Sequence, residues 1–166
     1  MASGKELRRR IQSVKNTQQI TKAMKMVSAA KLRRAQDGIV QARPYANAIR
    51  EVTRLITGNP DLREGHALLA KRDVKKVCIV LITSDRGLCG GYNANLNKRA
   101  EKIYREESKK YEKMTFVCIG KRGNEFLRLR KLPVHKYYEG VQKSISFAKA
   151  SAITEELVAS FLSGEF

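Results

Sequence analysis

The segment from Lys5 to Thr57 limits the possible folds of this chain more than any other part of the sequence. It contains one glycine, Gly38, and one proline, Pro44, and it is rich in Ala, Lys, Arg, Gln and Met, which favour helix. A helix of about 50 residues would be roughly 75 Å long, which exceeds the width of a small domain. We therefore expect one long helix that reaches beyond any domain attached to it.

The expected helix has recognisable ends and one weak point. Ser3 can cap its start, and the sequence Gly58-Asn59-Pro60 is a typical helix stop. Pro44 removes one backbone donor and clashes with the preceding turn, so we expect a kink there.

Apolar residues in this segment follow a seven-residue repeat, which is typical of a coiled-coil seam. The seam positions are Leu7, Ile11, Val14, Leu32, Ala35, Ile39, Ala42, Ala46 and Ile49. A seam needs a second long helix, and residues 58–166 hold no segment of that length. We expect the partner helix to come from another chain or from further sequence.

Two other features of the long helix suggest a second kind of partner. Ile20, Met24 and Val27 point to nearly the opposite side from the seam. The net charge of the chain is +18, and residues 1–57 hold thirteen Lys and Arg against three Asp and Glu. Such a charge indicates an acidic partner, either protein or nucleic acid. The sequence has no RNP-like, zinc-finger or helix-turn-helix spacing, which weakens the case for nucleic acid. A basic nucleic-acid-binding module is therefore kept only as the alternative.

Residues 58–73 are polar and are expected to form a linker, after which strands and helices alternate. Expected strands are 76–83, 115–120 and 134–138, and expected helices are 94–113, 124–131 and 147–162. Alternating strands and helices, with strands apolar on both faces, predict a parallel sheet covered on both sides over residues 74–166. A further strand would be expected after the last helix, so we expect this α/β domain to be incomplete at the C-terminus.

The loop Thr83–Asn93, TSDRGLCGGYN, follows the first expected strand, where α/β proteins often bind phosphates. Its glycines do not match the spacing GxGxxG, and it lacks GxxxxGK[ST], so we expect no nucleotide and no other cofactor. Cys89 has no neighbouring histidine motif to act as its base. No carboxylate pair indicates acid–base chemistry, and the chain is not expected to be an enzyme by itself.

The cysteines and the N-terminus bear on location. The three cysteines form no CxxC and no cluster with the two histidines, which argues against a zinc site and fits a reducing compartment. We find no run of 18 apolar residues and no secretory signal at the N-terminus.

Three blocks of sequence resemble the γ-subunit family of F-type ATP synthases, in its bacterial form. They are IQSVKNTQQITKAMKMVSAAKLRRAQ (residues 11–36), ARPYA (residues 42–46) and ITSDRGLCGGYN (residues 82–93). The resemblance extends over essentially all 166 residues and corresponds to the N-terminal three-fifths of that family.

This resemblance implies a fold and a role. The family's γ subunit is a central rotor shaft, an antiparallel coiled coil inside a ring of three α and three β subunits. A Rossmann-like domain at its base contacts ε and the membrane c-ring, without insertion into the membrane. Location at the cytoplasmic face of the bacterial plasma membrane follows. The residues expected to contact the α/β ring are Ile20, Lys22, Met24, Lys25, Val27, Arg33, Arg34, Asp85, Arg86 and Cys89.

Overall fold

The computed structural model describes residues 3–60, 66–70 and 72–166. The chain divides into two compact units, Met1–Gly65 and His66–Phe166, and each is described by itself. Within the described residues, no helix combines the length and apolarity needed to cross a membrane.

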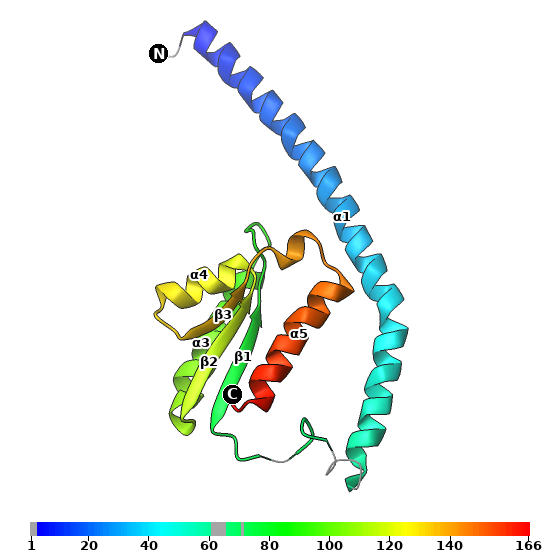
Figure 1. Ribbon diagram of the computed structural model, residues 1–166. Coiled ribbons are helices and arrows are strands. Elements are labelled where there is room, and N and C mark those ends of the chain that lie inside the picture. The colour runs from blue at the N-terminus through cyan, green and yellow to red at the C-terminus, as the bar shows by residue number, and fades with distance from the viewer. Residues whose placement is uncertain (1–2, 61–65, 71) are drawn as a thin grey trace. The chain divides into compact units, whose positions relative to one another are not determined.

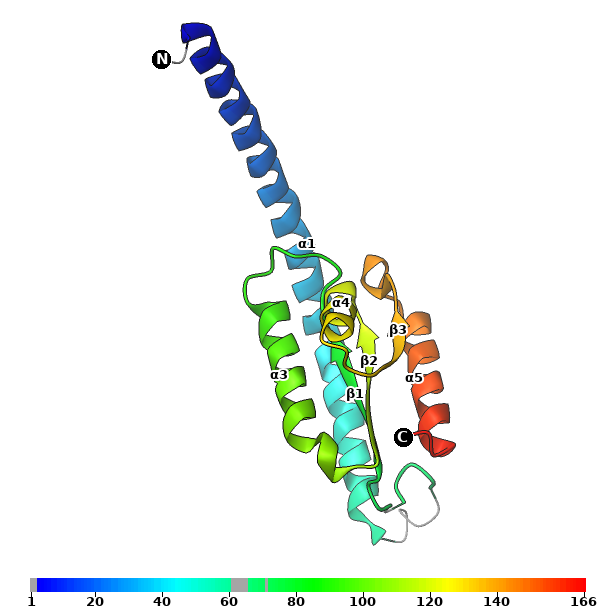
Figure 2. The same ribbon diagram turned by 90° about the vertical axis from the view of Figure 1, so that its left-hand side faces the viewer.

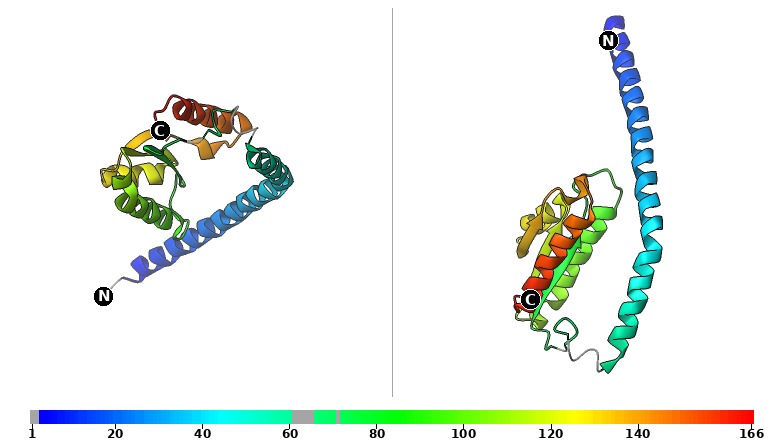
Figure 3. Two further views of the ribbon diagram at one scale, coloured as in Figure 1. Left: turned by 90° about the horizontal axis from the view of Figure 1, so that it is seen from below. Right: turned by 45° about the vertical axis from the view of Figure 1, so that its right-hand side comes forward.

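The first unit is dominated by α1, a helix of 55 residues from Gly4 to Gly58. The Ser3 hydroxyl accepts a hydrogen bond from the backbone N–H of Lys5 at 3.4 Å, and the extended backbone of Asn59 ends the helix. The predicted long helix is confirmed. Pro44 lies inside it, and Figures 1 and 3 show that α1 stays continuous but bends along its length.

Local interactions support α1 in place of a core. None of its residues is buried. Glu6 pairs with Arg10 at 2.9 Å, and Glu51 pairs with Arg54 at 3.0 Å, each within about one helical turn. Such pairs contribute only about 0.2–0.5 kcal/mol each. The helix therefore depends on backbone propensity and on whatever covers its apolar side chains.

The second unit is an α/β fold with a three-stranded parallel sheet in the order β1-β2-β3. Its elements are β1 (Lys76–Ile82), α3 (Tyr92–Glu107), η1 (Ser108–Lys110), β2 (Lys113–Ile119), α4 (Lys121–Leu129), β3 (Val134–Tyr138), η2 (Val141–Lys143) and α5 (Phe147–Leu162). Figures 1 and 2 show α3 and α4 on one face of the sheet and α5 on the other. The predicted α/β class, with a parallel sheet, is confirmed.

The core lies between the sheet and the helices α3 and α4. Phe116 and Cys118 of β2 are fully buried there, together with Leu81 of β1, Ala100 of α3 and Leu127 of α4. Burial of a large apolar side chain stabilises the fold by about 1.5–3 kcal/mol. Residues 114–118 of β2 are all buried, and successive residues of a strand point to opposite faces, so both faces of β2 are covered.

The opposite face of the sheet is covered unevenly. Val117 of β2 is fully buried, and Glu156 of α5 accepts hydrogen bonds from Lys136 and Tyr138 of β3. On the edge strand β1, the side chain of Val80 keeps 40% of its surface exposed. Thus α5 is tied to β3, and β1 is less covered on this face.

Several predicted bounds differ from those observed: β1 ends at Ile82 and not at residue 83, β2 spans Lys113–Ile119 and not 115–120, and two helices differ more. The expected helix 94–113 ends at Glu107, because Lys113 already pairs with Lys76 as the start of β2. The expected helix 124–131 begins earlier, at Lys121, because Asp85 in the loop after β1 accepts a hydrogen bond from its first N–H group. The helix 147–162 and the strand 134–138 were predicted with the bounds observed.

The expected linker, residues 58–73, lies partly outside the described residues, which lack 61–65 and 71. In its described part, the backbone N–H of Leu69 donates to the carbonyl of His66 at 2.8 Å and forms a turn.

Candidate functional site

The predicted coiled-coil seam is exposed on α1. The exposed fractions of its larger side chains are 56% for Leu7, 50% for Ile11, 67% for Val14, 60% for Leu32, 60% for Ile39 and 49% for Ile49. The seam alanines Ala35, Ala42 and Ala46 are exposed as well. This row of apolar side chains is far larger than the scattered apolar residues of an ordinary surface, which indicates an interaction surface.

The second predicted surface of α1 is exposed too. Ile20, Met24 and Val27 keep 61%, 56% and 56% of their surface exposed. Lys22, Lys25, Arg33 and Arg34 are exposed, and they form no ion pair with any described residue. The structure therefore presents an apolar patch and these four cations on one helix.

The loop Thr83–Asn93 is held together by Asn93. Its side-chain oxygen accepts from the N–H of Ser84 at 3.0 Å, and its Nδ2 donates to Ser84 Oγ at 2.7 Å. The same Nδ2 donates to Cys89 Sγ at 3.2 Å. One amide side chain thus joins the beginning, the middle and the end of the loop.

The same loop caps α4. Asp85 Oδ1 accepts from the N–H of Lys121 at 3.0 Å, the Ser84 carbonyl accepts from the N–H of Arg122 at 3.1 Å, and Thr83 Oγ1 accepts from the N–H of Gly123 at 2.7 Å. A helix N-terminus with free N–H groups is a common phosphate site. Here a carboxylate of the protein occupies that position at the start of α4.

Gln142 of η2 joins a second loop to the first. Its Oε1 accepts from the N–H of Asp85 at 3.2 Å, and its Nε2 donates to the carbonyl of Thr83. Asp85 is therefore fixed from two sides and is half-buried, whereas Arg86 and Cys89 are exposed.

The three thiols differ in environment. Cys89 is exposed, Cys78 is half-buried and Cys118 is buried. Burial raises the pKa of the Cys78 thiol, and burial raises the pKa of Cys118 to about 11. Among the described residues, no group of three or more His, Cys, Asp or Glu side chains could hold a metal ion.

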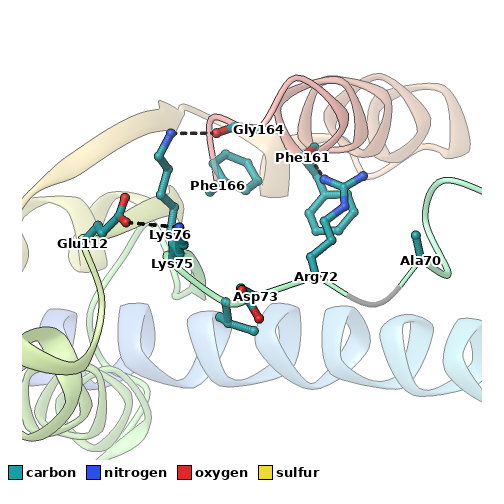
Figure 4. Close-up of a pocket in the computed structure, with 10 residues that line it drawn as sticks. Ala70, Arg72, Asp73, Lys75, Lys76, Glu112, Phe161, Gly164 and Phe166 are labelled. Atoms are coloured by element: carbon teal, nitrogen blue, oxygen red, sulfur yellow. Dashed lines mark hydrogen bonds and ion pairs between the residues drawn. The ribbon is translucent and has the colours of Figure 1, made fainter.

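A cavity of about 510 Å³ lies at the amino end of β1, at the sheet edge opposite the loop (Figure 4). Several of its polar groups are already paired within the unit. The guanidinium of Arg72 stacks over the ring of Phe161 at 4.5 Å, Lys76 Nζ donates to the carbonyl of Gly164 at 3.0 Å, and Lys75 lies 3.9 Å from Glu112. The described residues that line this cavity form no acid–base or nucleophilic arrangement.

Sequence reasoning missed two residues of the loop region. Gln142 gave no signal, because it lies 57 residues from the group it binds. Leu88 was not predicted to have a role, although it is fully exposed with a positive φ of 62°. An apolar residue between glycines in a polar loop was the available signal.

Comparison with known proteins gives a consistent result. The family model described as ATP synthase matches residues 3–166. Proteins named ATP synthase gamma chain from Geobacter sp. strain M21 and Geobacter metallireducens are 45% and 46% identical over 166 residues, which is 100% of this chain and 57% of each relative. The protein of that name from Bdellovibrio bacteriovorus is 45% identical over 167 residues, covering 100% of this chain and 56% of that relative.

The chain thus spans somewhat more than half the length of these relatives. Their similarity covers both the long helix with its exposed seam and the α/β unit with its capped loop. The chain belongs to the ATP synthase family, with gamma chains as its relatives.

Proposed function

We propose that this chain forms part of the central rotor shaft in the F1 sector of a proton-translocating ATP synthase. In this role it couples rotation of the membrane ring to conformational change at the catalytic sites of the β subunits. The observation that carries the proposal is the exposed heptad seam on a 55-residue helix, in a chain whose relatives are named ATP synthase gamma chain. The nucleic-acid-binding alternative gains no support from these relatives.

The partner of the seam is a second, antiparallel helix of the same shaft. The seam exposes large apolar side chains from Leu7 to Ile49, and a coiled coil covers such a row along its whole length. The relatives are longer than this chain, so they have sequence that could supply such a helix.

The patch of Ile20, Met24 and Val27, with the four cations beside it, faces acidic surfaces of a ring of α and β subunits. Complementary charge speeds association and fixes register more than it strengthens binding, which suits a surface that must move past its partner. The exposed loop residues Arg86 and Cys89 contact the same ring, and Asp85 acts by holding the loop on α4.

The α/β unit contacts the ε subunit and the membrane c-ring, which places the chain peripherally at the cytoplasmic face of a bacterial plasma membrane. The chain supplies no ATP chemistry itself. Catalysis belongs to the β subunits, and the filled anion position at the start of α4 agrees with a mechanical role for this loop.

The test replaces Lys22, Lys25, Arg33 and Arg34 by Gln and measures the rate of assembly with α and β subunits at several ionic strengths. Each exposed ion pair contributes only about 0–1 kcal/mol, so the single variants should differ little and the fourfold variant clearly. Wild type should assemble faster at low salt, and the difference should vanish near 1 M salt, where the Debye length is about 3 Å.

A matched control replaces four exposed cations of the α/β unit by Gln and so removes the same charge. They are Lys98, Arg99, Lys109 and Lys110. This control should assemble more nearly like wild type. Equal rates for the two fourfold variants would show that only net charge matters and would contradict the proposed surface. A wild-type chain that never associates with α and β subunits would contradict the proposed function itself.

A further inference from the structure

Asn97 of α3 is a buried polar residue whose side chain is not fully paired. It keeps 6% of its surface exposed, and its Oδ1 accepts no hydrogen bond from any described residue. No other buried side-chain oxygen or nitrogen in the described part of the chain lacks a partner. A buried acceptor without a donor destabilises a fold, and native proteins contain few of them. Asn97 therefore calls for an explanation beyond packing.

A cavity of about 380 Å³ lies between α3 and α4, and Asn97 forms part of its wall. The two helices share one face of the sheet (Figure 2). Such a volume is within the range of small-molecule sites. The last torsion of an asparagine side chain is broad, so a rotation about that bond can turn Oδ1 towards the cavity. A ligand with an N–H or O–H group would then supply the missing donor.

Other polar groups of the cavity wall are already engaged within the protein. Arg122 donates to Glu125 at 3.1 Å, and both polar atoms of the Asn93 side chain are bonded within the loop Thr83–Asn93. Lys98 is exposed and forms no ion pair with any described residue. The wall therefore leaves Asn97 Oδ1 as an acceptor and Lys98 as a cation for a ligand.

Apolar groups form another part of the wall. The ring of Phe126 is half-buried against the core, and Leu129 keeps 81% of its surface exposed. Covering these two side chains removes apolar surface from water, which favours binding. An aromatic ligand suits Phe126 in particular, because aromatic rings attract each other in offset or edge-to-face contact. The wall thus favours a ligand with an aromatic body, a hydrogen-bond donor and a negative charge.

We propose that the cavity between α3 and α4 binds a small aromatic carboxylic acid that carries a hydroxyl group. The ring packs on Phe126, the hydroxyl donates to Asn97 Oδ1, and the carboxylate lies beside Lys98. The inference does not rest on the proposed function, since it concerns the α/β unit alone.

Three small molecules serve as probes, each titrated into the isotope-labelled full chain and followed by nuclear magnetic resonance. Phloretate has the aromatic ring, the hydroxyl and the carboxylate. Hydrocinnamate is the same molecule without the hydroxyl, and tyramine keeps the hydroxyl but carries an ammonium group in place of the carboxylate. The amide signals of α3 and α4 report binding, and their shifts give each Kd.

We expect phloretate to bind with a Kd of about 1 mM or below, as for a well-placed ligand of its size. Hydrocinnamate should bind about fivefold more weakly, because it leaves Asn97 Oδ1 unpaired. Tyramine should bind about tenfold more weakly at low salt, because Lys98 repels its ammonium group. This second difference should shrink near 1 M salt.

Asn97→Ala and Asn97→Leu both remove the acceptor. The alanine variant keeps the cavity open, and it should bind phloretate and hydrocinnamate equally. The leucine variant fills part of the cavity, so it should bind both weakly and melt several degrees above wild type. Asn95→Leu is the matched control, because Asn95 is exposed on the same helix and does not line the cavity. It should keep the wild-type preference and melting temperature.

The wild-type comparison decides the inference even where a variant fails to fold. Equal binding of phloretate and hydrocinnamate to wild type, or shifted signals that lie outside α3 and α4, would overturn it. Shifts spread over the basic residues of the chain would mean nonspecific ion binding only. If Asn97→Ala keeps the preference for phloretate, the hydroxyl has another partner and the role given to Asn97 is wrong. None of these outcomes bears on the proposed function, which the assembly rates test separately.

Discussion

Apolar side chains lie at regular intervals in both α1 and β2, but only those of β2 are buried. In β2, Phe116, Val117 and Cys118 have no exposed surface, whereas on α1 Leu32 and Ile39 each expose 60%. Both segments are regular secondary structure, α1 a continuous helix and β2 a strand. The comparison shows that regular secondary structure and apolar periodicity do not by themselves make a core.

The difference follows from what each segment packs against. β2 lies between two strands and beneath helices on both faces, so its side chains meet partners from β1, α4 and β3. α1 has backbone hydrogen bonds and a few ion pairs between exposed side chains. Because most helix stability in proteins comes from packing an apolar face, α1 should be the less stable region until a partner covers its seam.

The strongest test of this difference compares two deletions of apolar side chains. Phe116→Ala should destabilise the α/β unit by about 3–5 kcal/mol, because it leaves a cavity in the core. Ile39→Ala, on the α1 seam, should change the stability of the isolated chain by less than about 0.5 kcal/mol. Urea unfolding followed by tyrosine fluorescence and circular dichroism measures both. A large loss from Ile39→Ala would mean that the seam is already packed.

Two glycines give a second contrast, of opposite sign. Gly120 has a φ of 109°, and a Cβ there would lie 2.0 Å from the carbonyl oxygen of Thr83, so Gly120→Ala should cost about 2–4 kcal/mol. Gly38 lies in α1, and a Cβ added to it would have nothing within 4 Å. Gly38→Ala should therefore favour the helix by up to about 1 kcal/mol, seen as a gain in far-UV dichroism. If both substitutions destabilised the chain, α1 would be constrained in a way the structure does not show.

Two thiols of the α/β unit give a third contrast between exposed and buried residues. Cys89 lies in the exposed loop, and Cys118 lies in the buried core. With its pKa raised to about 11 by burial, Cys118 should be alkylated at pH 8 at least about a hundredfold more slowly than the exposed Cys89. Since the folded pKa exceeds the reference value of 9.0, the protonated thiol stabilises the fold below pH 9, and this contribution is lost towards pH 11. Mass spectrometry of the alkylated chain gives both rates. Similar rates would indicate that β2 opens readily.

Most of the fold could be predicted from the sequence because its signals are local. The helix α1 is marked by composition and a glycine–asparagine–proline stop, and α5 by its amphipathic pattern after Ser146, whose hydroxyl caps it. The start of α4 could not be predicted in the same way. Gly123 looks like a helix breaker, yet it is needed because a Cβ there would lie 2.9 Å from Thr83 Oγ1.

The candidate site shows the same division. The seam and the basic residues of α1 follow from periodicity and charge. The part played by Asp85 depends on a contact 36 residues away, and that of Gln142 on one 57 residues away, so neither is visible in a local pattern. Which residues touch the α and β subunits stays a prediction.

Hydrogen–deuterium exchange of this chain, alone and in complex with α and β subunits, tests the central claim that α1 is one side of an interface while the α/β unit holds its own core. We expect the amides of β2 to exchange slowly in both samples, because their opening requires unfolding of the unit. The amides of α1 should exchange quickly in the free chain and slowly in the complex. Slow exchange of α1 in the free chain, or exchange that the complex leaves unchanged, would contradict the account.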